Sequence, residues 1–286
     1  GLLIYYIFGR SDLTKWTRKR MEAVNQEIER EVQANPEWER ELRELDPSAY
    51  CQSTYIKEWA NYPVYKNTAT QYYPSGEEMF PAILEALESA EHFIFMEYFI
   101  VEEGYMFGKI LDILKRKAAK GLDVRFVYDD FGCVTTLPAG YYRQMEAWGI
   151  RCVRFNPLYP VMSVIMNNRD HRKILVVDGK VGFTGGINLA DEYINRIERF
   201  GYWKDTGLRL EGEGVWSFTV MFLEMWDYVY KTRETDLSKF RPETYQTEPF
   251  LSDGFVQPYT DSPLDHETVG ENIYLNIINR AEKYVY

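Results

Sequence analysis

Residue types that suit phosphate chemistry gather in the stretch HRKILVVDGKVGFTGGIN, which runs from position 171 to position 188. His171 supplies a nucleophilic or basic imidazole, and Lys173 supplies a cation two residues later. Residues two apart on a strand point to the same face, so these two side chains can act on one bound group.

The rest of this stretch predicts a hairpin that returns to the His-Lys pair. ILVV is typical of a buried strand, Asp178-Gly179 of a turn, and VGFT of a second strand. The second strand brings Gly185, Gly186 and Asn188 back to the end where the imidazole and the ammonium lie. This end of the hairpin therefore suits a phosphate.

The candidate chemistry is exchange at a phosphodiester without a metal. Such a reaction needs a nucleophile, an acid for the leaving alkoxide and positive charge around the transition state. We expect Asn188 to donate a hydrogen bond to a phosphate oxygen, and a helix from about Leu189 to add backbone N–H groups. Gly185 and Gly186 would let the backbone approach closely. No cofactor is expected, and the sequence suggests no metal cluster, nucleotide loop or Ser/His/Asp arrangement.

The pattern His-x-Lys-x4-Asp-x6-Gly-Gly-x-Asn resembles the signature of the phospholipase D superfamily, with every spacing intact. The flanking NNRDHRKI and INLADEY look most like the bacterial cardiolipin synthases of that superfamily. Further similar segments are MEYFI (96–100), VRFVYDDFG (124–132), YWKDTGLRLEG (202–212) and VQPYTDSPLD (256–265). The resemblance implies that His171 forms a phosphohistidine, and that two phosphatidylglycerol molecules become cardiolipin and glycerol.

Asp178 belongs to that signature and is counted with it among the candidate catalytic residues, yet it lies at the far end of the hairpin. It is about 17 Å from Lys173 at ~3.4 Å per residue. We therefore interpret Asp178 as structural, holding the turn. His92 and His266 have no lysine two residues later and are interpreted as ordinary structural or surface histidines.

An attacking imidazole must be held in one tautomer by a partner on its other nitrogen. Asp205 is the candidate, because similar enzymes place an acidic residue about this far after the motif histidine. A surface ion pair between Lys204 and Asp205 is the alternative. The sequence departs from the family in having Gly207 where a histidine is common after Asp-Thr.

Glu97 and Tyr98 end a predicted buried strand, HFIFMEYFI, where α/β sheets bind ligands. They are candidates to line a head-group pocket. A buried, paired glutamate is an equally good interpretation of Glu97.

Composition narrows the possible partners. Acidic residues outnumber basic ones 44 to 33, giving a formal net charge of -11, which argues against nucleic acid as a partner. Aromatic residues make up 16%, which fits either a tyrosine-rich core or a protein at a lipid interface. Three cysteines without metal spacing predict reduced thiols in a protein that faces the cytosol.

The chain begins GLLIYYIFG and continues with a basic cluster. This pattern predicts that residues 1–10 end a transmembrane segment, although the first strand of a soluble protein is the alternative. Residues 11–50 are expected to form a charged helical juxtamembrane arm, interrupted at Asn35-Pro36, and residues 50–75 a loop. The expected location is a bacterial cell membrane, with the catalytic domain facing the cytoplasm and an anionic membrane surface as partner.

Residues 51–253 alternate between predicted strands and helices, which indicates an α/β sheet covered on both faces. The resemblance implies the αβαβα sandwich of the phospholipase D fold, with a mixed β-sheet, for which 51–253 would be the first lobe.

A short internal repeat concerns the end of the chain. LEALESAEHFIF (84–95) and LNIINRAEKYVY (275–286) match without gaps as a helix leading into a strand. We expect 254–286 to begin a second lobe, whose histidine would complete the site. The alternatives are a homodimeric nuclease-type phosphodiesterase, in which a dimer partner supplies the second histidine, and a non-catalytic lipid-binding half.

Overall fold

The structure is a computed structural model that describes residues 15, 19, 22–23, 31–157, 169–230, 234, 236–246, 248, 250, 252, 254–261 and 267–285. The predicted membrane segment at 1–10 lies outside these residues, as does most of 11–30. Among the helices that the structure describes, none combines the length and apolar character needed to cross a membrane.

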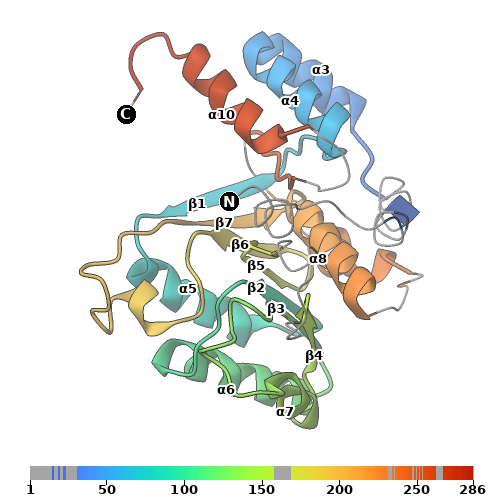
Figure 1. Ribbon diagram of the computed structural model, residues 1–286. Coiled ribbons are helices and arrows are strands. Elements are labelled where there is room, and N and C mark those ends of the chain that lie inside the picture. The colour runs from blue at the N-terminus through green and yellow to red at the C-terminus, as the bar shows by residue number, and fades with distance from the viewer. Residues whose placement is uncertain are drawn as a thin grey trace.

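Seven strands form one mixed sheet in the order β1-β7-β6-β5-β2-β3-β4 (Figure 1). The strands β2, β3 and β4 run parallel, whereas β5 pairs antiparallel with β2, and β6, β7 and β1 continue the antiparallel half. The strand bounds are β1 Thr68–Tyr73, β2 Phe93–Tyr98, β3 Asp123–Asp129, β4 Arg151–Phe155, β5 Ile174–Val177, β6 Val181–Gly185 and β7 Gly207–Gly212.

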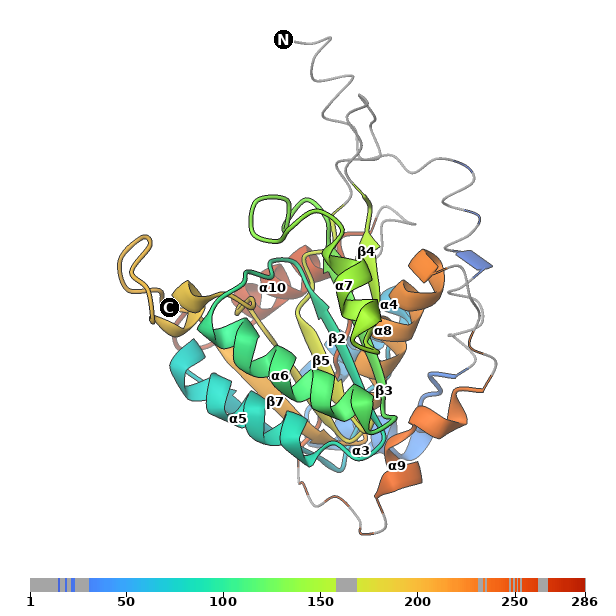
Figure 2. The same cartoon turned by 90° about the horizontal axis from the view of Figure 1, so that it is seen from below.

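Helices cover both faces of this sheet (Figure 2). On one side lie α5 (Gly76–Ser89), α6 (Tyr105–Ala119) and α7 (Tyr141–Ala147), and on the other lies α8 (Val215–Tyr230). Strand β2 serves both cores, since Ile94 and Met96 pack toward the first helices, whereas Phe93 and Phe95 pack toward α8. Burial on both faces explains the continuous apolar strands. The predicted α/β architecture is confirmed as one sheet between two helical layers, and the five-layer αβαβα sandwich stays a prediction.

The prediction of a loop over 50–75 was wrong. This part of the chain holds most of α4 (Pro47–Ala60) and all of β1. Asp46 caps α4 by accepting hydrogen bonds from the N–H groups of Ser48 and Ala49, and Pro47 occupies the first turn. Strand β1 is an edge strand that forms only by pairing with β7 far along the chain. Tyr and Thr suit such a strand, although their local pattern suggested a loop.

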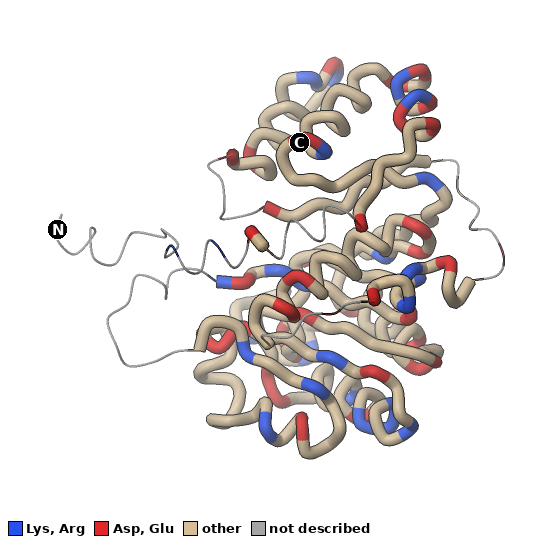
Figure 3. The backbone as a smooth tube through the Cα atoms, turned by 90° about the vertical axis from the view of Figure 1, so that its right-hand side faces the viewer, with Lys and Arg blue, Asp and Glu red and all other residues tan. Residues whose placement is uncertain are grey.

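Helix α3 (Pro36–Leu45) begins where an interruption was predicted. Asn35 caps it through hydrogen bonds from the N–H groups of Glu37 and Trp38. Its charges alternate in sign, and Figure 3 shows both signs mixed at this end of the molecule. The predicted boundary at residue 50 falls inside α4, so the arm and the lobe are joined by a continuous helix.

The second copy of the repeat forms its helix, α10 (Val269–Asn279), beside α4 (Figure 1). No strand follows it among the described residues 280–285, unlike the first copy, where α5 leads into β2. The two copies differ because a strand needs neighbouring strands to satisfy its backbone hydrogen bonds. Strand β2 has two such neighbours, β3 and β5, whereas residues 280–285 pair with no described strand. The remaining short elements are η2 (Asp191–Ile194), η3 (Ser238–Phe240) and α9 (Pro242–Tyr245).

Candidate active site at one end of the sheet

The predicted hairpin is confirmed as β5 and β6. Both Asp178 and Gly179 adopt positive φ, at 50° and 68°, which the reversal of the chain requires. The pairing of Ile174 with Thr184 brings the beginning of β5 and the end of β6 together. His171 and Lys173 therefore lie at the same end of the sheet as the glycine pair, where parallel β2 and β3 also end.

His171 is exposed and lies three residues before the first residue of β5, Ile174. Its ring packs against Phe99, with 4.8 Å between ring centroids. Partial burial and the nearby ammonium of Lys173 lower the pKa of His171 below its ordinary value, whereas Asp170 opposes this shift. The imidazole is therefore mainly neutral at pH 7 and can act as a nucleophile.

Lys173 is only 5% exposed. Its Nζ donates a 2.7 Å hydrogen bond to the carbonyl oxygen of His171 and lies 5.5 Å from the centroid of the Phe99 ring. Burial lowers the pKa of Lys173 to about 8, against the raising effect of Asp170 and Asp205. The group still carries its charge at neutral pH, beside the imidazole that a phosphate would meet.

Gly185 and Gly186 are exposed, and each allows the chain around Asp205 to approach closely. A Cβ on Gly185, whose φ is +150°, would lie 2.4 Å from the carbonyl oxygen of Thr206, and one on Gly186 would lie 2.0 Å from Asp205 Oδ1. The group that approaches these glycines is the protein's own 205–206 segment, and the approach of their backbone to a phosphate stays a prediction.

The hydrogen bonds that the structure gives Asp205 come from groups other than the imidazole of His171. Its carboxylate accepts hydrogen bonds from Trp203 Nε1 at 3.3 Å and from the N–H of Thr206 at 2.8 Å. Its charge acts on the pKa of Lys173, whereas the charges that shift the pKa of His171 are those of Lys173 and Asp170. The alternative ion pair is not formed either, because Lys204 donates to the carbonyl oxygen of Pro74. The tautomer-holding role of Asp205 stays a prediction.

Asn188 reaches the predicted end of the sheet but is only 2% exposed. Its Oδ1 accepts from the N–H of Ile100 at 3.0 Å, and its Nδ2 donates to the hydroxyl of Tyr193 at 2.8 Å. The expected direct bond to a phosphate oxygen is thus corrected to a structural one. Asn188 ties the segment after β2 to the segment after β6, and the backbone bond from Glu102 to Leu189 continues this tie.

The expected helix after Asn188 was also wrong. Only the short 3-10 helix η2 forms there, and it ends at Asn195, whose φ is 50°. The carboxylate of Asp191 caps α6 by accepting from the N–H groups of Tyr105 and Met106. No helix dipole of useful length therefore points at the site from this segment.

Asp178 is fully buried at the opposite end of the hairpin. It accepts three backbone hydrogen bonds, from the N–H groups of Glu91, His92 and Phe93, at 2.8–2.9 Å. These bonds fix the beginning of β2 against the β5–β6 turn, as the structural interpretation of Asp178 predicted. The side chain has no contact with the phosphate end.

Glu97 and Tyr98 do not line a pocket, which corrects their assignment as substrate-binding residues. Glu97 is 0% exposed and pairs with Arg172, at 2.7 Å between Oε1 and Nη2, while Tyr98 is 2% exposed within the core under α5 and α6. The strand end is covered on both faces, so the first accessible side chain is that of Phe99. Of the two interpretations offered for Glu97, the buried pair is the one observed.

Residues that sequence reasoning missed lie beside the motif. Phe99 contacts both motif side chains, and its place near the end of the predicted strand HFIFMEYFI was the available signal. Asp170 and Arg172 flank His171 and enter a buried ion network, joined by a 3.0 Å bond between Arg172 Nε and Asp170 Oδ1. Asp129 accepts from the N–H of Asp170. The sequence NNRDHRKI shows that Asp170 and Arg172 are charged, but no local pattern indicated that they are buried in an ion network.

Within the described ranges, no three or more His, Cys, Asp or Glu side chains are grouped to hold a metal ion. A cavity lined by Trp38, Tyr65, Asn67, Trp216 and Arg241, among others, lies elsewhere. Thr68 and Gly212 pair beside it, at the end of the sheet remote from Gly185 and Gly207. The motif residues take no part in that cavity.

Comparison with known proteins places this site in context. The family described as "Cardiolipin synthase, PLD-like domain" matches residues 83–199. The chain is 50% identical over 248 residues to an uncharacterized protein of Streptococcus mutans, covering 86% of the chain and 52% of that protein. It is 34% identical to a cardiolipin synthase of Alkalihalophilus pseudofirmus, covering 100% of the chain and 56% of that protein.

Among solved structures, the chain is similar to phosphatidylserine synthase from Haemophilus influenzae, at 16% identity and a TM-score of 0.45, covering 81% of this chain and 48% of that one. The chain spans about half the length of the curated relatives it matches. The motif stretch 171–188 lies inside the matched family region.

Proposed function

Because this chain belongs to the phospholipase D superfamily and has bacterial cardiolipin synthases among its relatives, we propose that it forms one lobe of a phosphatidyltransferase. The proposed reaction converts two phosphatidylglycerol molecules into cardiolipin and glycerol. The observation that carries the proposal is the pairing of exposed His171 with the buried cation of Lys173 at one end of the sheet.

The proposed reaction has two displacement steps at phosphorus. In the first, a nitrogen of His171 bonds to phosphorus, the bond from phosphorus to the glycerol oxygen breaks, and an acid on a second lobe protonates the leaving glycerol. In the second, a hydroxyl of another phosphatidylglycerol attacks phosphorus and displaces His171, passing its proton to the same second-lobe group. Lys173 stabilises the charge that gathers on the phosphate oxygens in both steps. The chemistry requires no cofactor.

The surface of α10 supports a second lobe as partner. In α5, whose end carries the first copy of the repeat, Ile83, Ala86 and Leu87 are 1%, 6% and 0% exposed. In α10, the residues at the same offsets, Tyr274, Ile277 and Ile278, are 71%, 55% and 50% exposed. The helix thus presents a sheet-packing face that no described residue covers. We propose that a second phospholipase D-like sheet packs there, supplied by the same full-length polypeptide or by a dimer partner.

Exposed aromatic side chains near the site support the proposal that the protein acts at a membrane surface. Phe131 is 51% exposed after β3, while Phe200 and Tyr202 are 74% and 67% exposed before β7. Both segments flank the end of the sheet that carries His171. Aromatic side chains at such positions suit the lipid interface. We propose that the protein acts at a bacterial cell membrane, with the site facing the cytoplasm. Both proposed substrates are lipids of that membrane.

Cardiolipin formation from phosphatidylglycerol vesicles tests the proposal. This chain and a version extended by a second lobe would be compared, with His171→Ala in the extended form. We expect turnover from the extended protein, none from its variant, and little from the short chain. Hydrolysis of DNA by the short chain, with lipid left unchanged, would favour a homodimeric nuclease. Vesicle binding without turnover by both forms would favour a lipid-binding half instead.

A further inference from the structure

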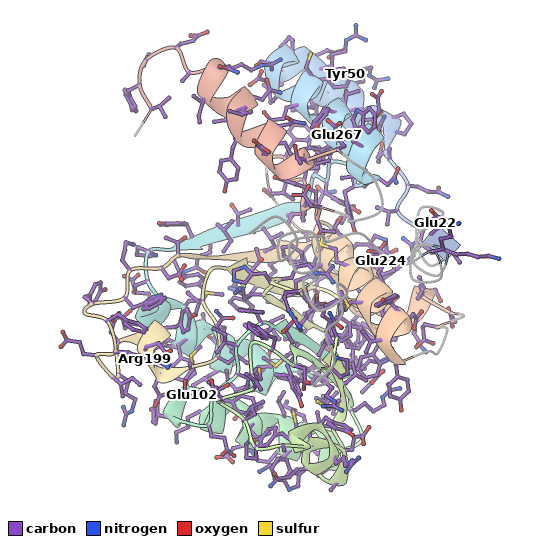
Figure 4. The ribbon with its side chains drawn as sticks, in the orientation of Figure 1. Glu22, Tyr50, Glu102, Arg199, Glu224 and Glu267 are labelled. Carbon is purple, nitrogen blue, oxygen red and sulfur yellow. The ribbon has the colours of Figure 1, made fainter. Side chains whose placement is uncertain are left out.

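A group of ionisable side chains lies buried behind His171. Glu97 and Asp170 are 0% and 4% exposed, and they come from the end of β2 and from the residue before the imidazole. Glu224 enters from α8, where it accepts a 3.2 Å hydrogen bond from the Tyr62 hydroxyl (Figure 4). The cation of the group is Arg172, which reaches Glu97 Oε1 at 2.7 Å and Asp170 Oδ1 at 3.0 Å.

The charges of this group do not balance if every carboxyl is ionised. The two buried carboxylates, Glu97 and Asp170, then face one guanidinium, which leaves a net charge of about -1 away from water, and Glu224 adds negative charge from α8. Removing unpaired charges from water costs several kcal/mol per ion, on the order of the stability of a whole domain. A proton held within the group lowers this cost, since it removes one negative charge without removing a side chain.

The hydrogen bonds indicate which carboxyl holds the proton. Asp170 Oδ1 already accepts from the backbone N–H and the Nε of Arg172, so Asp170 is suited to remain charged. Its Oδ2 and both oxygens of Glu97 are buried and make no well-aligned hydrogen bond to a donor in the described part of the chain. The same guanidinium, that of Arg172, holds Glu97 at 2.7 Å and Asp170 at 3.0 Å, so the two carboxyls are neighbours and a proton on one can complete the bonding of both.

We propose that Glu97 is a neutral carboxylic acid whose O–H donates to Asp170 Oδ2, and that it acts as a positioning residue for the 170–173 segment. The electrostatics agree with this arrangement. Burial, followed by the charges of Asp170 and Glu224, holds the pKa of Glu97 well above its usual range, against the lowering effect of Arg172. Burial and these charges therefore favour the neutral form of Glu97 over the ionised form.

The consequence reaches the candidate site through Asp170. This residue is adjacent to His171, its N–H bonds to Asp129, and its charge raises the pKa values of both His171 and Lys173. A neutral Glu97 leaves Arg172 to balance Asp170 and fixes the carboxylate in place. An ionised Glu97 would repel Asp170 and loosen the segment that carries the imidazole.

Infrared difference spectroscopy of this chain at pH 7 tests the proposal without any assay of turnover. A protonated carboxyl has a C=O stretch at higher frequency than the stretches of a carboxylate. We expect the wild-type spectrum to contain such a band, Glu97→Gln to remove it, and the exposed control Glu85→Gln to keep it. If Glu97→Gln instead removes carboxylate intensity and leaves the high-frequency region unchanged, the proposal is overturned.

A second variant tests whether Glu97 is protonated because of its pairing with Asp170 or because of burial alone. Asp170→Asn removes the neighbouring negative charge and leaves Glu97 facing Arg172, so we expect Glu97 to ionise and its band to disappear although Glu97 is present. A band that persists in Asp170→Asn contradicts the pairing. If Glu97→Gln fails to fold, the band of the wild-type protein is followed as a function of pH instead. Loss of that band at the pH where an ordinary carboxyl group ionises overturns the proposal. These readouts do not depend on the proposed phosphatidyl transfer.

Discussion

Lys173 Nζ donates a 2.7 Å hydrogen bond to the carbonyl oxygen of His171, the residue two positions earlier. The cation is therefore fixed to the backbone of the proposed nucleophile, and both side chains also contact the Phe99 ring. Positive charge held in place before substrate arrives stabilises a charged transition state without further reorganisation. This relationship underlies the first two predictions, which concern the protein extended by a second lobe.

Lys173→Met is expected to lower turnover by a factor of about 100 or more, as loss of a preorganised charge does in other sites. Lys173→Arg should not restore it, because the planar guanidinium does not fit a pocket shaped for an ammonium that is 5% exposed. Lys180→Met, at the far end of the same hairpin, is the matched control and should keep near wild-type turnover. Turnover on vesicles and the urea midpoint would be measured for all three. Normal turnover in Lys173→Met would remove Lys173 from the mechanism.

The pH dependence of kcat/KM should be bell-shaped. His171 must be neutral to attack, and since its pKa is lowered, activity should fall only as pH drops below about 6.5. Lys173 must be charged, and its pKa of about 8 predicts loss of activity as pH rises through that value. An alkaline limb near the ordinary lysine value of about 10.4 would contradict the burial effect on Lys173.

Asp178→Ala should destabilise this chain by about 2 to 5 kcal/mol, because it leaves three backbone N–H groups at the beginning of β2 without their acceptor. Urea unfolding followed by circular dichroism measures the change in the free energy of unfolding. Asp112→Ala, on the exposed face of α6, is the control and should change it by no more than about 0.5 kcal/mol. Unchanged stability in Asp178→Ala would argue for a role in chemistry instead.

Gly186→Ala should act through Asp205. The new methyl group would lie 2.0 Å from Asp205 Oδ1, so the carboxylate must move. Because Asp205 raises the pKa of Lys173, its displacement should shift the alkaline limb of the pH profile to lower pH. Gly108→Ala, whose Cβ would meet nothing within 4 Å, should leave the profile unchanged. An identical profile for the two variants would show that Asp205 does not influence Lys173.

The hairpin was predicted correctly because neighbouring residues alone determine its strands and its turn. The strands, the Asp178-Gly179 turn and the return of the glycine pair follow from spacing alone, and the structural interpretation of Asp178 followed from distance along a strand. Burial at the strand ends was not local. Glu97 looked like a pocket residue until Arg172, from 75 positions away in the sequence (172 − 97), was seen to cover it.

Helix α4 and strand β1 show the same difference between a local sequence signal and a contact made far along the chain. The capping pair Asp46-Pro47 was a readable signal for α4 that the Tyr-rich composition obscured. Strand β1 had no such signal, since its pairing with β7 joins Thr68 to Gly212. Asn188 was correctly brought to the site by spacing, but its hydrogen bonds to Ile100 and Tyr193 depend on neighbours that the motif does not specify.

The exposed face of α10 gives the last prediction, which compares two isoleucines on one helix. Ile278 is 50% exposed, whereas Ile273 is 5% exposed in the core cluster that also contains Ile56 of α4. In this chain, Ile278→Ala should change the free energy of unfolding by no more than about 0.5 kcal/mol, and Ile273→Ala should lower it by about 2 to 5 kcal/mol. In the protein extended by a second lobe, Ile278→Ala should become as costly as Ile273→Ala, because a second sheet would then bury that side chain. Urea unfolding of the two parent proteins and their four variants measures these differences. If Ile278→Ala has no effect on the stability of the extended protein, the second lobe does not pack on this face of α10.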